Sequence, residues 1–348
     1  MDSITQAVLG ASVSGVMLGR FHGRKAYVAG AVIATLPDLD VFIDYGNPIA
    51  GMINHRGFSH SVFVLTAFAF LLTWLIRKWP PATQYDWKRL FATLWLIFIT
   101  HVLADAFTSY GTQLFWPFMP TPTSWSSIFI IDPFFTIPML LAVIAGFGWG
   151  AKPVVQKMNV FALGWCAVYL CLSLAAKYWV EHRVRSDLAQ AGVGVDSVFS
   201  TPGPFNIALW RVVVRTNDDH YYEYITSVFD DSPNERIKVR LNTPLADQFE
   251  SAEMINGLRW FTGDWLRYDV INRQLVATDL RMGLGTGFYS FRFRVAELDD
   301  EGNWQVVEPS RWPSERGLDA LKSVMDRVLS TSPPLPLAQW EARMHDGP

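Results

Sequence analysis

Hydrophobic and polar positions divide the chain into two parts at about residue 180. The first part consists mostly of long apolar runs, with no Glu before Glu181 and only seven Asp. The second part is rich in charge and alternates between apolar and polar positions. A membrane-spanning helix needs about 20 mostly apolar residues. The pattern therefore predicts an α-helical membrane domain over residues 1–180 and a soluble, mainly antiparallel β domain over residues 190–348.

The apolar runs predict about six helices. Four are clear candidates for spans, at residues 61–76, 90–108, 128–149 and 158–179. The first two, at 3–19 and 26–36, are shorter, and we expect a helical hairpin that is either fully inserted or re-entrant. The Gly, Ala and Ser content of residues 3–19 favours close helix packing. The first residues lack the positive segment of a cleavable signal peptide, so we expect this run to remain in the mature protein.

Basic residues predict the orientation in the membrane. Nine Lys and Arg residues lie in the loops 20–25, 77–89 and 150–157, whereas the loops 41–59 and 109–127 contain only Arg56. The positive-inside rule places the first set of loops in the cytoplasm. By alternation, the N-terminus, the other loops and the C-terminal domain would then face outward. Six of the seven Asp, and three His, fall at these outward helix ends.

The second part alternates with period two from about residue 204 to 309. Runs at 210–214, 221–225 and 291–295 predict antiparallel strands of a small sandwich or barrel. Residues 317–329 predict an amphipathic helix, and the Pro-rich residues 332–336 a terminal strap. The glycine-rich run 283–287 is too isolated to predict a nucleotide loop. A net charge of −3 argues against nucleic-acid binding.

Candidate chemistry gathers at the outward end of the predicted helices. Residues 54–61 contain His55 and His60, with Ser59 or Ser61 as candidate helix cap and Gly57 as a candidate for a tight turn. His101 and Asp105 are four apart in a helical pattern, which puts them on one face. A polar pair that only satisfies a helix contact is the alternative. It is less favoured near a membrane, where ionisable groups need partners.

Pro37–Asp40 adds two carboxylates at the end of an apolar helix. If this segment is extended, the side chains of Asp38 and Asp40 diverge, so that one binds a metal while the other supports or bridges. A polar C-terminal turn is the alternative, although carboxylates there oppose the helix dipole. Mixed imidazole and carboxylate ligation suits zinc, iron or manganese, and paired carboxylates allow more than one ion. The predicted metal ligands are Asp38, Asp40, His55, His60, His101 and Asp105.

Further residues receive narrower predictions. Asp40 would bridge metals or act as general base, and Arg56 would contact a phosphate oxygen. Asp2 is either a favourable first-turn acid or, with Gln6, part of the site. Asp132, which precedes Pro133, is favoured as a helix N-cap, with a place in the site as the alternative. Cys166 and Cys171 lie in one apolar run and are predicted to pack there.

The order of these motifs resembles a known family. Met1–Gln6, Pro37–Asp40, His55–Ser61 and His101–Asp105 together resemble the YdjM-like (LexA-regulated) family of membrane-bound, metal-dependent hydrolases, over residues 1–180. That family is distantly similar to zinc-dependent phospholipase C and single-strand nucleases. The resemblance implies phosphoester hydrolysis with a divalent metal, and zinc is the metal expected. Many members have His where this chain has Gln6, and the His-xxx-Asp helix occurs once, so we expect one or two ions.

We therefore expect a membrane-embedded hydrolase whose metal-bound water attacks a phosphoester at the periplasmic face. Membrane lipids are the expected partners, a lipid headgroup is the expected substrate, and no nucleic acid is expected. The alternative is a non-enzymatic membrane protein with a structural metal site and a β domain that binds a partner of unknown identity. A transporter is disfavoured because the ionisable groups lie at helix ends.

Overall fold

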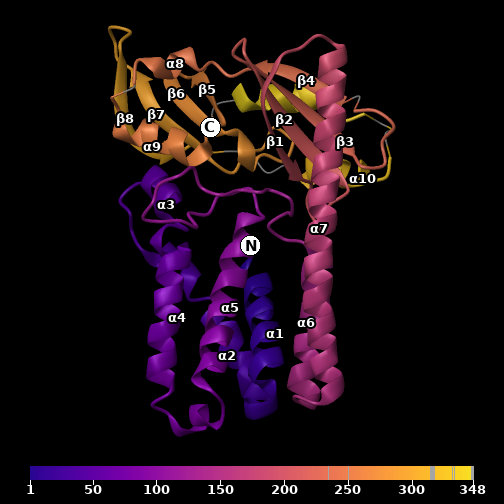
Figure 1. Cartoon of the computed structure of the whole chain (residues 1–348). Helices are drawn as coiled ribbons and strands as arrows, with labels where there is room; N and C mark the ends of the chain where they lie inside the picture. The colour runs from indigo at the N-terminus through magenta and orange to yellow at the C-terminus, as the bar shows by residue number, and fades with distance from the viewer. Residues whose placement is uncertain (234, 250, 314–317, 331, 333, 346–348) are drawn as a thin grey trace. The chain divides into compact units, whose positions relative to one another are not determined.

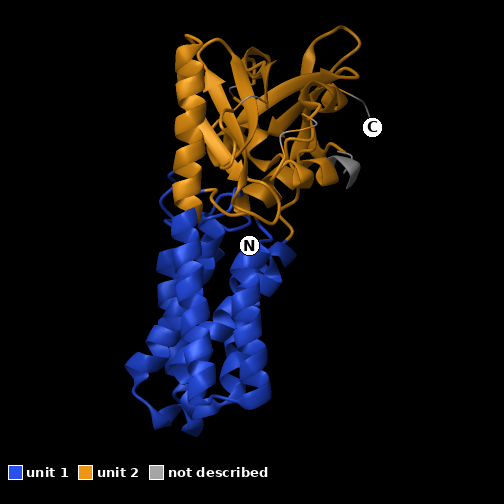
Figure 2. Ribbon diagram, turned by 90° about the vertical axis from the view of Figure 1, so that its right-hand side faces the viewer, with its two compact units in different colours: residues 1–43, 55–125, 130–172 blue, residues 44–54, 126–129, 173–348 orange. Residues whose placement is uncertain are grey.

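A computed structural model describes residues 1–233, 235–249, 251–313, 318–330, 332 and 334–345. Backbone contacts divide the chain into two compact units, coloured separately in Figure 2. The first, which we call the helical unit, comprises Met1–Ile43, His55–Trp125 and Ile130–Leu172. The second, the β unit, comprises Asp44–Asn54, Ser126–Phe129 and the chain from Ser173 onward. Two short segments of the N-terminal half of the chain therefore belong to the β unit.

The helical unit contains a helix at each of the six predicted positions. Its elements are α1 (Ser3–His22), α2 (Arg24–Ala34), the 3₁₀ helix η1 (Pro37–Phe42), η2 (Phe58–His60), α4 (Val62–Ile76), η3 (Pro80–Gln84), α5 (Trp87–Ala106), α6 (Pro133–Trp149) and the first part of α7 (Pro153–Gln190). Helix α1 contacts α2 and α5, and α4 contacts α5, so these helices run lengthwise beside one another (Figure 1). Helix α7 continues well past its predicted end at residue 179.

The number of membrane spans is smaller than the pattern predicted. Among the described residues, two helices, α5 and α7, are long and apolar enough to cross a membrane. A third span is possible if Pro48–His60 and α4, which meet at a bend of 49°, count as one. Helix α6 is apolar but has only 17 residues. At about 1.5 Å per residue, the 11 residues of α2 cover roughly half of a hydrocarbon core about 30 Å thick.

Small residues bring α1 and α2 together, as their composition predicted. A Cβ atom added at Gly10 would lie 2.5 Å from the carbonyl oxygen of Gly30, and a Cβ at Gly30 would meet the carbonyl of Gly10. Helix α1 begins at Asp2, whose carboxylate accepts hydrogen bonds from the N–H groups of Ile4 and Thr5. This cap fixes the end of α1 from which Gln6 reaches α5.

The described strands of the β unit form two four-stranded antiparallel sheets. The first has the order β1 (Val195–Pro202), β2 (Leu209–Thr216), β3 (His220–Ser227), β4 (Glu235–Arg240), and the second β5 (Leu266–Ile271), β6 (Gln274–Asp279), β7 (Arg292–Leu298), β8 (Trp304–Arg311). These are open sheets rather than one closed barrel. Strand β1 lies before residue 204, where the predicted strands begin. It was not predicted, because its sequence VDSVFSTP lacks the alternation that identifies a strand.

Helices cover parts of these sheets. The helical elements are α3 (Pro48–Asn54), α8 (Pro244–Asp247), α9 (Glu253–Thr262), η4 (Leu280–Met282), α10 (Leu318–Asp326), α11 (Leu337–Ala342) and η5 (Arg343–His345). The later turns of α7 pack Val180, Val184 and Leu188 against Trp210 of β2. The core of the first sheet is therefore completed by a helix that precedes it in the chain.

Two predictions fall partly outside the described residues. The predicted helix 317–329 corresponds to α10, while Gly317 lies outside the described part of the chain. Pro333 of the predicted strap also lies outside it. The N–H of Leu335 donates to Glu235 of β4 over 2.8 Å, and Leu335 is packed with Leu337 and Trp340. The described part of the tail is thus fixed against the first sheet.

Candidate metal centre

The 3₁₀ helix η1 carries Asp38 and Asp40. Pro37 is its first residue, which suits a position whose N–H has no helical partner. The segment is helical rather than extended, yet the two carboxylates still diverge, because positions two apart in a 3₁₀ turn point to different sides. The side chain of Asp38 is 23% exposed and that of Asp40 is buried. The two carboxylates therefore have different surroundings.

The turn after His55 depends on Arg56. Arg56 has a positive φ of 62°, whereas Gly57, the predicted turn residue, has a negative φ of −86°. This left-handed conformation directs the N–H of Arg56 to Oδ2 of Asp40 over 2.9 Å. Ser61 caps α4, as predicted, by accepting from the N–H of Val64.

Helix α5 presents His101 and Asp105 on one face, as their spacing predicted. Nε2 of His101 lies 3.3 Å from Oδ2 of Asp105, and both side chains are buried. His60 of η2 approaches the same point, with its Nε2 3.3 Å from Nε2 of His101 and 3.2 Å from Oδ2 of Asp105. Three buried donor atoms from two segments thus face one another.

Asp38 completes a group of four donors that could hold one metal ion. Its Oδ1 lies 3.3 Å from Nε2 of His60 and 3.5 Å from Nε2 of His101. All four donor atoms lie within 4.8 Å of one another. Zinc bonds of about 2.0–2.1 Å in a tetrahedron place neighbouring donors roughly 3.3–3.4 Å apart. Five of the six separations among the four donors, those that involve His60 or His101, are 3.2–3.5 Å and match this spacing.

One unpaired polar atom supports the fit to a cation. Oδ2 of Asp105 is buried and accepts no hydrogen bond from the residues that the structure describes. Leaving a buried polar atom unpaired is costly, and more so on a charged group. A metal ion between the four donors would pair with Asp105 Oδ2 and remove this cost.

Asp40 organises the surroundings of the group. It accepts hydrogen bonds from Nδ1 of His55 (2.8 Å) and Oγ of Ser59 (2.6 Å). Ser59 Oγ also lies 2.9 Å from Nδ1 of His60, and Asp40 Oδ2 lies 3.8 Å from the same nitrogen. Contacts of this kind orient a metal-binding imidazole by its outer nitrogen. His60 is thereby held with Nε2 toward the donors.

Both carboxylates of η1 are held in the charged form. Burial raises the pKa of Asp40, but hydrogen bonds from His55 and Ser59 outweigh it and leave the pKa below its ordinary value. Burial also raises the pKa of Asp38, and hydrogen bonds with His101 and His60 outweigh it in the same way. The deprotonated carboxylate is the form that binds a metal.

The second oxygen of Asp105 is already occupied. Its Oδ1 lies 3.1 Å from Nη2 of Arg56 and accepts a hydrogen bond of 3.1 Å from Nε2 of Gln6, and the amino group of Met1 pairs with it as well. Arg56 is 4% exposed, and its Nε has no hydrogen-bond partner within the described residues. These contacts orient Asp105 so that its other oxygen, Oδ2, faces the other three donors.

Comparison with known proteins agrees with this motif order. Residues 1–180 match the family model described as YdjM inner membrane protein. The chain belongs to this family. It is also 27% identical over 229 residues, or 64% of this chain and 67% of the relative, to the "Uncharacterized protein YfhP" of Bacillus subtilis (strain 168). No solved structure matches the chain significantly.

In this YdjM-family chain, the structure brings together four of the six predicted ligands. Asp40 and His55 adjoin the group without contributing to it, and their direct ligation stays a prediction. Gln6 reaches Asp105. The predicted N-cap at Asp132 is confirmed, because its carboxylate accepts from the first turn of α6. The Met1 amino group was not foreseen, since nothing in the sequence pattern marks it.

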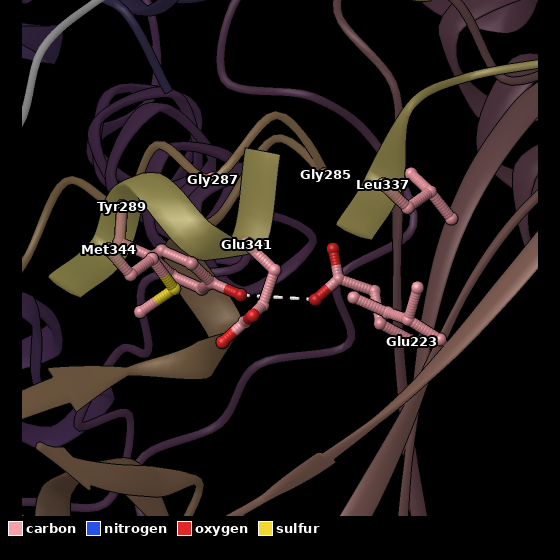
Figure 3. A pocket seen from close by; sticks show the side chains of 8 residues that line it. Glu223, Gly285, Gly287, Tyr289, Leu337, Glu341 and Met344 are labelled. Atoms are coloured by element: carbon pink, nitrogen blue, oxygen red, sulfur yellow. Dashed lines mark hydrogen bonds between the residues drawn. The ribbon is translucent and has the colours of Figure 1, made fainter. Parts of the chain in front are cut away.

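The β unit contains a second group of buried ionisable residues. Arg211 donates from Nε and Nη2 to the two carboxylate oxygens of Glu223, at 3.0 and 2.9 Å. Tyr289 donates to Glu223 over 3.0 Å (Figure 3). Burial raises the pKa of Glu223, but its ion pair with Arg211 outweighs burial and lowers that pKa below the ordinary value. The glutamate is thus a charged member of the core of this YdjM-family protein.

A small cavity adjoins Glu223 and Tyr289 and includes the glycine-rich run. Gly285 and Gly287 line it, both with a φ of +74°, and a side chain at Gly287 would strike the carbonyl of Trp340. The cavity volume is about 10 Å³, which is close to what a single water molecule needs. The glycines serve close packing, and the cavity is too small for a nucleotide.

Proposed function

We propose that this YdjM-family protein is a metal-dependent hydrolase that cleaves a phosphoester at the periplasmic face of the inner membrane. One observation carries the proposal: donor atoms of Asp38, His60, His101 and Asp105 lie within 4.8 Å of one another and could hold a metal ion. Zinc is the metal proposed, and this group would hold one ion. A bound zinc ion would supply a water molecule with a pKa near 7 as nucleophile.

The exposure of the ligands gives the proposed centre a direction of access. The side chains of His60, His101 and Asp105 are 0–1% exposed, whereas that of Asp38 is 23% exposed. Substrate would therefore approach on the side of Asp38. Catalytic zinc sites can take a fifth ligand, so the water would have to enter as a fifth ligand on this side.

Proton transfer is assigned to the pair of His55 and Asp40. Asp40 Oδ1 contacts Nδ1 of His55, whose side chain is 25% exposed, and this contact orients the ring so that Nε2 can accept a proton. Asp40 has both oxygens in hydrogen bonds and acts by positioning His55. Arg56 pairs with Asp105 beside the donors, and its positive charge there suits an anionic phosphoryl oxygen.

A lipid headgroup is the proposed substrate class. Apolar side chains beside Asp38 in η1 are exposed: Leu39 by 50%, Val41 by 64% and Phe42 by 83%. Phe58, in η2 with His60, is 45% exposed. Exposed apolar side chains that flank ionised groups fit the boundary between headgroups and acyl chains. A phosphoester held at this depth would belong to a membrane lipid.

A structural metal site is the second candidate function. Four protein donors fill a tetrahedral zinc site completely, and closed sites of this kind are structural. In that case the metal would connect η1, η2 and α5 without taking part in a reaction.

The deciding experiment measures metal content and turnover on the same samples. Purified protein in detergent is loaded with zinc and assayed on bis-p-nitrophenyl phosphate and on phosphatidylcholine vesicles. Turnover that stops with a chelator, returns with zinc and is absent from His60→Ala supports the hydrolase. Bound metal without turnover on either substrate would favour the structural candidate, and a wild-type protein that binds no metal would exclude both.

Orientation has a separate test. Alkaline phosphatase joined to the C-terminus of the full chain is active only in the periplasm. We expect activity there, in line with the distribution of basic residues in the loops. An inactive fusion, together with a fluorescent cytoplasmic fusion, would overturn the proposed periplasmic face.

A further inference from the structure

The chain between the two halves of the candidate metal centre belongs to the β unit. Residues 37–43 carry Asp38 and Asp40, and the second half begins at His55. Between them, Asp44–Asn54 groups with the β unit rather than with the helical unit. This segment contains α3 (Pro48–Asn54). The metal centre is therefore connected through its own backbone to a helix that packs in the β unit.

Helix α3 is fixed by apolar contacts inside the β unit. It contacts α9 and β8. Ile49 is 0% exposed and Met52 is 2% exposed. Ile53 approaches α9 so closely that a Cβ atom added at Gly257 would lie 2.9 Å from its Cδ1. The position of α3 thus depends on residues that follow it by some 200 positions in the chain.

A short covalent and hydrogen-bonded path leads from α3 to the donors. His55 follows Ile53 by two positions, and its Nδ1 lies 2.8 Å from Asp40. The next N–H, that of Arg56, donates to the other oxygen of Asp40. Asp40 in turn lies with Ser59 against the outer nitrogen of His60. The end of α3 is thus joined, through the backbone to His55 and Arg56 and through their hydrogen bonds to Asp40, to the surroundings of His60.

We propose that the β unit positions the metal centre through α3, with Ile53 and Gly257 as the positioning contact. The inference rests on the proposed function only because both concern the same candidate metal centre. It gives the β unit a role that no motif in its sequence suggested. Outer contacts to metal-binding histidines commonly change metal affinity by about 10–100-fold, which sets the scale of the effect.

The test enlarges the contact and then relieves it. Gly257→Leu places a side chain where Ile53 lies, and Ile53→Ala in the same chain restores the space. Gly51→Ala is the matched control, since a Cβ atom at Gly51 meets no atom of the described residues within 4 Å although it lies in α3. Zinc affinity is measured by competition with a chelator, and cobalt-loaded protein gives the ligand-field spectrum. Carbethoxylation of His55, followed by mass spectrometry, needs no metal.

We expect Gly257→Leu to weaken zinc binding at least tenfold, to change the cobalt spectrum and to speed modification of His55. Adding Ile53→Ala should bring all three within about threefold of wild type, and Gly51→Ala should leave them unchanged. Unchanged readouts in Gly257→Leu, or losses that Ile53→Ala does not restore, would overturn the inference. Failure of hydrolysis alone would overturn only the proposed function, because none of these readouts is turnover. If the wild type binds no zinc, the proposed function fails while modification of His55 still decides the inference.

Discussion

Nε2 of His60 and Nε2 of His101 lie 3.3 Å apart, although 41 positions separate the two residues. Two imidazole nitrogens at this distance require either a proton on one of them or a cation between them. Carboxylate oxygens of Asp38 and Asp105 flank the pair on the scale of metal coordination. Substitution of one of these two histidines is therefore the most direct test of metal binding.

Removing one histidine should remove the metal. We expect His60→Ala to reduce bound zinc from about one ion per chain to background, because a tetrahedral site loses one of its four donors. Metal content after dialysis against a weak chelator measures this. Asp132→Asn is the control, since asparagine caps a helix about as well as aspartate and Asp132 is not one of the four donors. Equal zinc in His60→Ala and the control would contradict the assignment.

Asp40→Asn should weaken zinc binding without abolishing it. The amide keeps the size of the side chain but loses the charge that accepts hydrogen bonds from His55 and Ser59. We expect zinc affinity to fall about 10–100-fold, as for other outer contacts of metal-binding histidines. Chelator competition gives the value. A complete loss of zinc would instead support the original prediction that Asp40 is itself a ligand.

Metal removal should destabilise the helical unit. At a free zinc concentration 100 times the Kd, binding to the folded state contributes about 2.7 kcal/mol. The melting temperature in detergent should therefore fall on addition of a chelator and recover when zinc is returned. The same cycle with His60→Ala should show no change. A melting temperature independent of zinc in the wild type would mean that the four donors do not bind it.

Gly10→Ala should separate α1 from α2. The added methyl group would lie 2.5 Å from a backbone carbonyl of Gly30, which cannot move as a side chain can. Overpacking of this kind costs about 1–3 kcal/mol. Unfolding of the purified protein in mixed detergent and dodecyl sulfate measures the loss. Gly164→Ala is the control, since no atom of the described chain lies within 4 Å of its added methyl group.

The β unit should lose stability in acid through Glu223. Its pKa is lowered in the folded state, so its contribution is fully present above the unfolded pKa of about 4.3 and is lost as pH falls through the folded pKa. Hydrogen exchange of peptides from residues 209–227, corrected for the intrinsic rate, should show the loss below about pH 4.5. Glu223→Gln should remove this pH dependence. It should also lower stability at pH 7 by about 3 kcal/mol, because Arg211 stays charged and buried.

The sequence predicted the helical positions and the donors that are close along the chain. His101 and Asp105 are one helical turn apart, so their common face follows from the period of the helix alone. The N-cap at Asp132 likewise needs only its neighbours. The approach of His60 to His101 was inferred from their shared level at the outward helix ends, and its distance depends on how α4 and α5 pack.

Residues whose role depends on distant contacts could not be assigned. Asp40 and Asp38 have the same side chain two positions apart, and only the packing of η1 against η2 decides which one faces Nε2 of His60 and His101. Strand β1 was missed because its pairing partner β2, rather than its own pattern, makes it a strand. Fewer of the described helices qualify as spans than the apolar runs predicted, because a run such as α2 or α6 gives a helix that is short for crossing a membrane.

The length of α7 has a consequence for dividing the protein. The family match ends at residue 180, inside this helix, while Val184 and Leu188 beyond it complete the core of the first sheet. A cut there would divide α7 and take Val180 from the cluster around Trp210, and it would leave Ile49 and Met52 of α3 without α9 and β8. The two units should therefore be inherited, expressed and degraded together, although their sequences look like separate modules.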